Sequence, residues 1–124
     1  MRMYSADVLE KLIGEAHRHN VVCIADEVFT GFGRTGKLFA CHHLKEKPDI
    51  IAVSKGITGG ALPLGATSCS EQIVKAFTTP DFSKTFFHGH SYTANPIACA
   101  AANIFAAKRT IDARCACSTR VITR

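Results

Sequence analysis

The sequence contains 124 residues, of which 47% are hydrophobic and 20% charged, a composition that indicates one globular unit and excludes a disordered or fibrous chain. No apolar run approaches the roughly 20 residues of a membrane helix, because Asp26, Glu27, Lys37 and Lys55 interrupt the candidates. The first residues, MRMYSADVLEKL, lack the apolar stretch of a signal peptide. We therefore expect neither a membrane partner nor secretion, and a cytoplasmic location.

The excess of positive charge is concentrated at the carboxyl end. The formal net charge is +5, and segment 108–124 carries five of the 15 basic residues but only one of the 10 acidic ones. Outside that segment the two signs nearly balance, so the sequence offers no basic face for a nucleic acid. We expect a structured unit over residues 1–107, a basic and aperiodic tail over 108–124, and no nucleic-acid partner.

The six cysteines do not follow a disulfide or zinc pattern. Cys23 and Cys99 lie inside apolar runs, where cysteine usually acts as a small buried hydrophobe. The clusters CHH (41–43) and CAC (115–117) do not repeat at the C-x₂-C spacing of zinc ribbons. We expect free thiols and no metal site.

The apolar pattern predicts helices and strands in alternation. Ser5 fits the N-cap of a first helix, whose apolar residues recur at helical spacing up to Ala16. The runs VVCIA (21–25) and DIIAV (49–53) are typical of short strands buried on both faces, and LGATSC (64–69) predicts a third strand. Two further helices are expected, one from Ser70 to Phe77 and one from the cap Asn95 to about residue 107.

This order of elements predicts an α/β fold. Three strands and three helices cannot cover both faces of such a sheet, so the sequence indicates part of a larger domain. Asp26 follows the first strand and Lys55 the second, and in open α/β sheets the carboxyl ends of the strands form the ligand crevice. The two side chains are expected either in one functional site or as an ion pair at the sheet edge.

The strings IADEVFTGFGRTG (24–36) and PDIIAVSKGITGG (48–60) resemble the signature of the class III pyridoxal-phosphate aminotransferases. The 29 positions from Asp26 to Lys55 also fit that family. The resemblance implies that residues 1–107 are an incomplete part of the large cofactor-binding domain of a fold-type I aminotransferase, a three-layer α/β/α unit with a mostly parallel sheet. It does not extend into 108–124, a segment not expected to be native to the family.

The resemblance also implies roles for the residues of the two strings. Lys55 would form a Schiff base with pyridoxal 5′-phosphate and then carry the proton between substrate and cofactor. Asp26 would keep the pyridine nitrogen protonated. Val28 would pack against the ring, or else be an ordinary core valine. Glu27 is expected to point away from the cofactor in a structural role.

A third string, TFFHGHSYTANPIACAAA (85–102), resembles the family segment that supplies a hydroxyl to the cofactor phosphate of a neighbouring subunit. Ser91 occupies the hydroxyl position, often Thr in relatives, and Gly89 and His90 would border the same pocket. The resemblance thus implies a homodimer. Arg34 would shape the substrate pocket, or else stabilise its own loop.

Within the family, the segments MRMYSADVLEKL, GRTGKLFACHH and FFHGHSYTANPIACAAA resemble the branch that transfers an amino group from S-adenosylmethionine to 8-amino-7-oxononanoate in biotin biosynthesis. The product of that reaction is 7,8-diaminononanoate. Another ω-aminotransferase, of the acetylornithine, ornithine or 4-aminobutyrate type, stays open as an alternative, as does a non-catalytic remnant. We expect the 124-residue chain to be inactive on its own.

Overall fold

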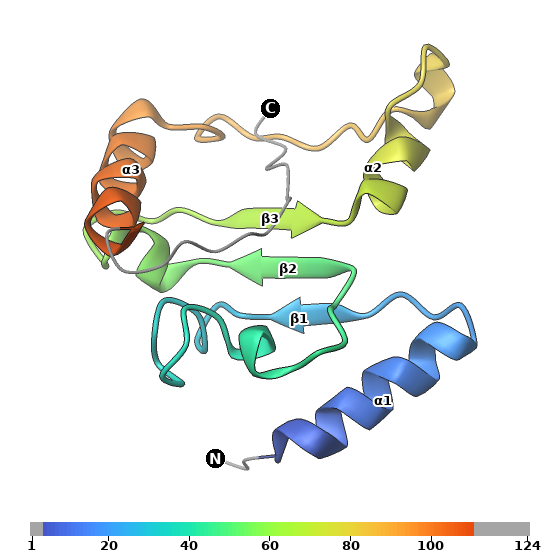
Figure 1. Cartoon of the computed structure of the whole chain (residues 1–124). Coiled ribbons are helices and arrows are strands. Elements are labelled where there is room, and N and C mark those ends of the chain that lie inside the picture. Colours follow the sequence, from blue (N-terminus) through green and yellow to red (C-terminus); the bar gives the residue numbers. More distant parts are fainter. Residues whose placement is uncertain (1–3, 111–124) are drawn as a thin grey trace.

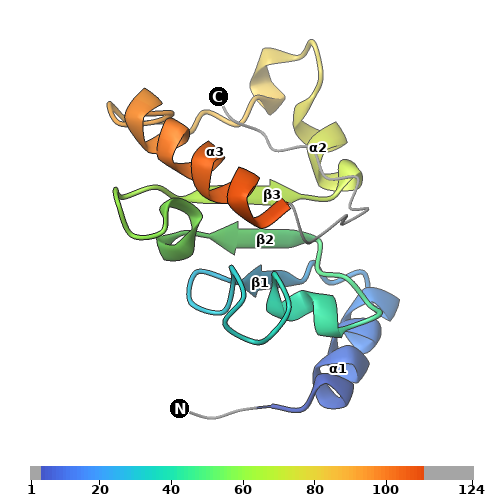
Figure 2. The same ribbon diagram turned by 60° about the vertical axis from the view of Figure 1, so that its left-hand side comes forward.

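The structure, a computed structural model, describes residues 4–110. A three-stranded sheet in the order β1-β2-β3 forms its centre (Figure 1). Helix α1 lies beside the β1 edge, and helix α3 lies at the other side of the molecule, near β3 (Figures 1 and 2). The strands are β1 (Ile24–Asp26), β2 (Ile50–Val53) and β3 (Ala66–Cys69), and the α-helices are α1 (Ala6–Arg18), α2 (Glu71–Phe77) and α3 (Pro96–Thr110).

The sheet is mixed. Strands β1 and β2 are parallel, with Asp26 opposite Ala52, whereas β2 and β3 are antiparallel, with Val53 opposite Ala66. Because β1 and β2 are parallel, their carboxyl ends meet at one edge of the sheet. One of the two pairings in this part of the chain is therefore parallel, in a segment expected to come from a mostly parallel sheet.

The helices begin where the sequence predicts them. Ser5 takes the extended N-cap conformation before α1, although its side chain makes no capping hydrogen bond. Before α3, the Asn95 Oδ1 atom accepts hydrogen bonds from the N–H groups of Ile97 and Ala98, at 3.0 and 3.1 Å. This side chain satisfies two of the amides that a helix start leaves unpaired. Helix α3 continues to Thr110; residues 111–124, most of the predicted tail, lie outside the described residues.

Strand β1 is shorter than predicted. The N–H of Val21 donates to the carbonyl of Ala16 at 2.9 Å, so residue 21 belongs to the turn that closes α1. The expected burial on both faces is also absent from the described residues, since Ile24 is 66% exposed and no residue of β1 or β2 is fully buried. Within residues 4–106, the buried hydrophobic residues are Cys41, Leu44 and Ala98.

Helix α3 packs against the short 3₁₀ helix η2 (Lys55–Thr58), which directly follows β2 and so connects α3 to the sheet. Two further 3₁₀ helices, η1 (Ala40–His43) and η3 (Phe82–Lys84), lie in the connections. None of the helices in residues 4–110 is long and apolar enough to span a membrane.

Candidate active site

Asp26 and Lys55 lie at the same edge of the sheet. Asp26 ends β1, and Lys55 begins η2 two residues after β2 ends, so parallel pairing carries both residues to the carboxyl edge. Both residues are exposed. The two exposed side chains, a carboxylate and an amine, are open to a ligand at this edge.

The backbone at Lys55 is in an uncommon conformation. Its φ is 43°, in the left-handed region that non-glycine residues rarely adopt. The turn is fixed on both sides, because the Ser54 hydroxyl donates to the Leu64 carbonyl at 2.7 Å and the N–H of Ile57 donates to the Ser54 carbonyl at 3.1 Å. Such outliers concentrate at functional positions, where the surrounding structure maintains them.

A cluster of three phenylalanines lies against this turn. A Cβ added to Gly56 would lie 2.8 Å from the ring of Phe32, so only glycine leaves room for that ring. Phe32 in turn packs edge-on against Phe39 and Phe105, with ring centroids 5.4 and 6.2 Å apart. Through Phe105, helix α3 helps to set the position of Lys55.

Phe29 contacts two cationic side chains, and sequence reasoning missed it. The Nζ atom of Lys55 lies 5.7 Å from the centroid of the Phe29 ring, and Cζ of Arg34 lies 4.7 Å from the same centroid. Both contacts are within the range of cation–π attraction. The structure thus places Arg34 and Lys55 against one ring. The sole sequence signal was an aromatic three positions after Asp26.

Glu27 has the structural role that was expected of it. It is 2% exposed, and its carboxylate accepts hydrogen bonds from the Thr30 hydroxyl, from Ala40 N–H at 3.0 Å and from Cys41 N–H at 2.7 Å. Burial alone would raise the pKa of Glu27, but these hydrogen bonds outweigh it and hold the pKa below its ordinary value. The carboxylate therefore ties the start of the glycine-rich loop that follows β1 (residues 27–39) to η1.

Asp26 and Val28 differ from Glu27 in their surroundings. The Asp26 Oδ1 atom accepts a hydrogen bond from the N–H of Val28 at 3.0 Å, and the carboxylate is otherwise directed to an exposed position. Val28 is half-buried. Of the two adjacent carboxylates, Asp26 is the one accessible to a ligand.

Gly89, His90 and Ser91 lie in the connection between α2 and α3, which runs beyond β3 on the side away from β1 (Figures 1 and 2). The His90 Nδ1 atom accepts from Tyr92 N–H at 3.1 Å, and His90 N–H donates to the Thr93 hydroxyl at 2.9 Å, which forms a tight turn around the exposed Ser91. Gly89 lines an open hollow together with Phe82, Phe86 and Phe87. These three consecutive residues thus lie in the connection before α3, whereas Asp26 and Lys55 lie at the carboxyl edge of the β1–β2 pair.

Comparison with known proteins gives a family match for most of the chain. The model of the family Aminotransferase class-III matches residues 1–111. The adenosylmethionine-8-amino-7-oxononanoate aminotransferase of Synechococcus elongatus is 50% identical over 102 residues, which are 82% of this chain and 24% of that enzyme. The omega-amino acid–pyruvate aminotransferase of Pseudomonas putida is 42% identical over 88 residues, 68% of this chain and 20% of the relative.

Solved structures agree with the sequence comparison. The adenosylmethionine-8-amino-7-oxononanoate aminotransferase of Methanocaldococcus jannaschii matches with a TM-score of 0.79 at 42% identity, over 90% of this chain and 28% of that one. An amine transaminase from an uncultivated Pseudomonas species, solved in its PLP-bound form, matches with a TM-score of 0.75 at 40% identity, over 84% of this chain and 24% of that one. The fold is thus an incomplete α/β part of a fold-type I aminotransferase, as expected. The chain spans about a fifth to a quarter of the length of the curated relatives it matches.

Proposed function

The chain belongs to the class-III aminotransferase family, and from this premise we propose that it forms part of an enzyme that transfers an amino group with pyridoxal 5′-phosphate. The proposed donor is S-adenosylmethionine and the proposed acceptor is 8-amino-7-oxononanoate, the pair in the name of the relatives that are about half identical. The observation that carries the proposal is the exposure of Asp26 and Lys55 at one edge of the β1–β2 pair. We infer a cytoplasmic location from the biosynthetic role.

The chemistry of the available side chains fits this cofactor. A pyridine nitrogen that carries a proton needs an accessible carboxylate, and Asp26 provides one while Glu27 is already saturated by three donors. The aldehyde of this cofactor binds through an accessible amine. Lys55 provides one, on a turn whose backbone is fixed. When bound, pyridoxal 5′-phosphate supplies an aldehyde that reacts with amines and a ring that accepts electron density.

Each residue of the candidate site has its own role in the proposed reaction. The Lys55 amine holds the cofactor and afterwards, when free, moves a proton to and from the reacting carbon. The Asp26 carboxylate keeps a proton on the ring nitrogen and so stabilises negative charge that develops in the reaction. Val28 packs beside the ring. Arg34, held over the same Phe29 ring that Lys55 contacts, adds positive charge to the site and orients the substrate.

We propose a separate role for the segment before α3. The connection from α2 to α3, which contains His90 and Ser91, runs beyond β3, and both residues are exposed, so they suit a second site, that of the partner subunit in a homodimer. There, Ser91 would donate its hydroxyl to the cofactor phosphate, and Gly89, beside the aromatic hollow, would border the substrate. The active site would then need both chains.

We propose this activity for the assembled enzyme and not for the 124 residues alone. Many large apolar side chains of the described chain stay exposed, including Val21, Ile24, Phe86, Phe87 and Ile97. Such a surface needs to be covered before a rigid site can form. The isolated chain is therefore expected to lack activity, as predicted from its sequence.

A chimera tests the function directly. Residues 5–106 replace the matching segment of the Methanocaldococcus jannaschii enzyme, whose fold they share. The chimera is expected to form 7,8-diaminononanoate from S-adenosylmethionine and 8-amino-7-oxononanoate. Lys55→Ala should abolish product formation, whereas Lys75→Ala, an exposed lysine paired with Glu71, should leave it unchanged.

The second candidate is an ω-aminotransferase that uses pyruvate, favoured by the 42% identity to the Pseudomonas putida enzyme. It would be identified by amination of pyruvate by ω-amino acids in the same chimera, without turnover of 8-amino-7-oxononanoate. A chimera that folds and binds the cofactor but aminates neither acceptor would favour a non-catalytic remnant.

A further inference from the structure

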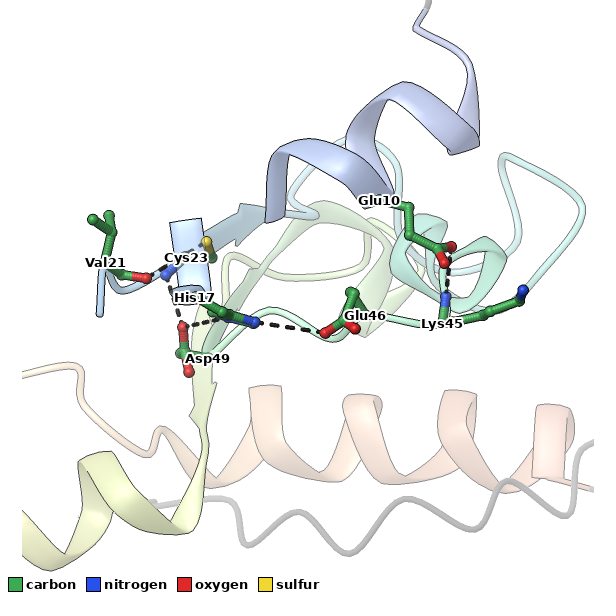
Figure 3. A network of polar contacts seen from close by, with 7 residues as sticks. All are labelled: Glu10, His17, Val21, Cys23, Lys45, Glu46 and Asp49. Carbon is green, nitrogen blue, oxygen red and sulfur yellow. Dashed lines mark hydrogen bonds and ion pairs between the residues drawn. The ribbon is translucent and has the colours of Figure 1, made fainter. Parts of the chain in front are cut away.

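A cluster of metal-ligand side chains lies at the edge of the sheet opposite to Asp26 and Lys55. His17 lies in the last turn of α1, Cys23 precedes β1 and Asp49 precedes β2 (Figure 3). One ligand atom of each lies within 4.8 Å of the other two, and all three residues are half-buried. It is the one such group of histidine, cysteine and acidic side chains within residues 4–110.

The spacing of the first two ligands suits a tetrahedral ion. The Nε2 atom of His17 lies 3.2 Å from Oδ2 of Asp49. Two ligands about 2.0–2.1 Å from a tetrahedral Zn²⁺ lie about 3.3 Å apart, so the observed separation is already close to that of a pair on one ion. The thiol of Cys23 completes a set of nitrogen, oxygen and sulfur donors, which suits zinc and excludes the hard ions Ca²⁺ and Mg²⁺.

Neighbouring groups lie against two of the ligands. The N–H of Cys23 donates to Oδ2 of Asp49 at 2.8 Å, which fixes the carboxylate beside the cysteine. Oε2 of Glu46 lies 3.7 Å from Nδ1 of His17, the ring nitrogen that faces away from Asp49 (Figure 3). A carboxylate on the outer nitrogen of a ligating histidine orients the ring and strengthens the metal bond.

We propose that His17 Nε2, Cys23 Sγ and an Asp49 carboxylate oxygen bind one Zn²⁺, with Glu46 as the outer partner of His17 and water as the fourth ligand. Cys23 would bind as the thiolate and release its proton to solvent. The ion would tie the end of α1 to the amino ends of β1 and β2. Sequence inspection expected no metal, because positions 17, 23 and 49 follow no ligand spacing and come together only in the fold.

The competing interpretation is a metal-free hydrogen-bond network. In it, His17 donates to Asp49 and contacts Glu46, and Cys23 donates weakly from its thiol to the Val21 carbonyl at 3.8 Å. The two interpretations differ in one measurable property, since only the metal site binds an ion through the Cys23 thiolate.

Cobalt titration of the reduced, chelator-treated chimera, which contains the whole cluster and both control positions, provides the first test. Thiolate charge-transfer and tetrahedral d–d bands should saturate at one Co²⁺ per chain and disappear when Zn²⁺ is added. Cys23→Ser and Asp49→Asn should each weaken binding by about tenfold or more, and Glu46→Gln by about tenfold.

Matched controls use the same residue types outside the cluster. Cys69 lies in β3, and His19, two residues after His17, contacts Glu15 instead of the cluster. The Cys69→Ser and His19→Gln variants should therefore bind cobalt as tightly as the unchanged chain. Absence of saturable bands would overturn the proposal, as would bands that survive Cys23→Ser or that vanish equally in Cys69→Ser.

Alkylation kinetics test the same site without any substitution in the cluster. Zn²⁺ should slow the alkylation of Cys23 and leave that of Cys69 unchanged, with each peptide read by mass spectrometry. Equal rates at Cys23 with and without Zn²⁺ would contradict the proposal even if a variant failed to fold.

Discussion

The buried carboxylate of Glu27 accepts the backbone N–H of Cys41 at 2.7 Å, and so joins two residues that are 14 positions apart. The same carboxylate accepts the N–H of Ala40 and the hydroxyl of Thr30. Glu27, which directly follows Asp26, is thereby fixed to η1. The direction of the glycine-rich loop, and with it the contact of Arg34 and Phe29, depends on this carboxylate.

Glu27→Gln should destabilise the chimera by about 2 kcal/mol, because hydrogen bonds to a charged group contribute about 1.5–3 kcal/mol and the amide has only one acceptor oxygen. Urea unfolding measures the change. Glu71→Gln is the matched control, since Glu71 is exposed and paired only with Lys75 across one helical turn. Equal effects of the two substitutions would show that the Glu27 hydrogen bonds do not support the fold.

The stability conferred by Glu27 should also depend on pH. Its pKa is lowered in the folded protein, so the unfolded chain binds more protons between the lowered and the ordinary pKa. The contribution is complete above the ordinary pKa and disappears as the pH falls through the lowered one. Unfolding free energies of wild-type and Glu27→Gln chimeras should therefore converge as the pH falls from about 7 into the acid range. A constant difference would contradict the lowered pKa.

Gly56→Ala should reduce the activity of the chimera roughly tenfold to a hundredfold, because small displacements of a catalytic group have effects of that size. The added methyl group would lie 2.8–3.0 Å from Phe32, which is packed by two further rings, and Lys55 would have to move. Gly65→Ala is the control, since the nearest atom to its Cβ, a backbone oxygen of Val53, is 3.8 Å away. Similar losses in both variants would exclude the Phe32 contact as the cause.

Sequence patterns identified the helices and the strand ends because these depend on local chemistry. Helical spacing after Ser5 and the cap at Asn95 act within one or two turns, and the structure has α1 and α3 where they predict them. The positions of Asp26 and Lys55 follow from the two apolar runs, since parallel strands bring their carboxyl ends together. Glu27 was expected to point away from the site, and its buried hydrogen bonds confirm that role.

Features that depend on distant packing could not be predicted in the same way. Apolar strands indicated burial on both faces, yet Ile24 is mostly exposed, because the described residues include nothing that covers it. The contact of Phe29 with Arg34 and Lys55 depends on how the loop folds back, and no local pattern encodes that. The approach of His17 to Asp49 likewise joins residues 32 positions apart.

Phe29→Leu should lower kcat/KM of the chimera about two- to fivefold, the loss that corresponds to an exposed cation–π contact of about 0.5–1 kcal/mol. The ring is the feature under test, since leucine keeps the apolar bulk without the π face. Phe29→Tyr keeps the ring and should retain wild-type kcat/KM. A tyrosine variant as impaired as the leucine variant would mean that ring contact with Lys55 and Arg34 does not matter.

The proposed division of each active site between two subunits predicts complementation. Lys55→Ala and Ser91→Asp chimeras should each be inactive, the second because its carboxylate would repel the cofactor phosphate. In a mixed dimer, Lys55 of one chain and Ser91 of the other are both intact at one site, and both are damaged at the second site. Random exchange of subunits should therefore restore about one quarter of wild-type activity, because half of the dimers are mixed and half of their sites intact.

A second pair of variants serves as the control for that mixture. Asp26 and Lys55 follow adjacent strands of the same chain, so Asp26→Asn and Lys55→Ala damage the same site of their own subunit. Mixing them leaves one lesion in every site of a mixed dimer, and no activity should return. Native mass spectrometry shows whether mixed dimers of the Lys55→Ala and Ser91→Asp chains have formed. If they have formed but activity stays at the level of this control, Ser91 serves the site of its own subunit and the shared site is excluded.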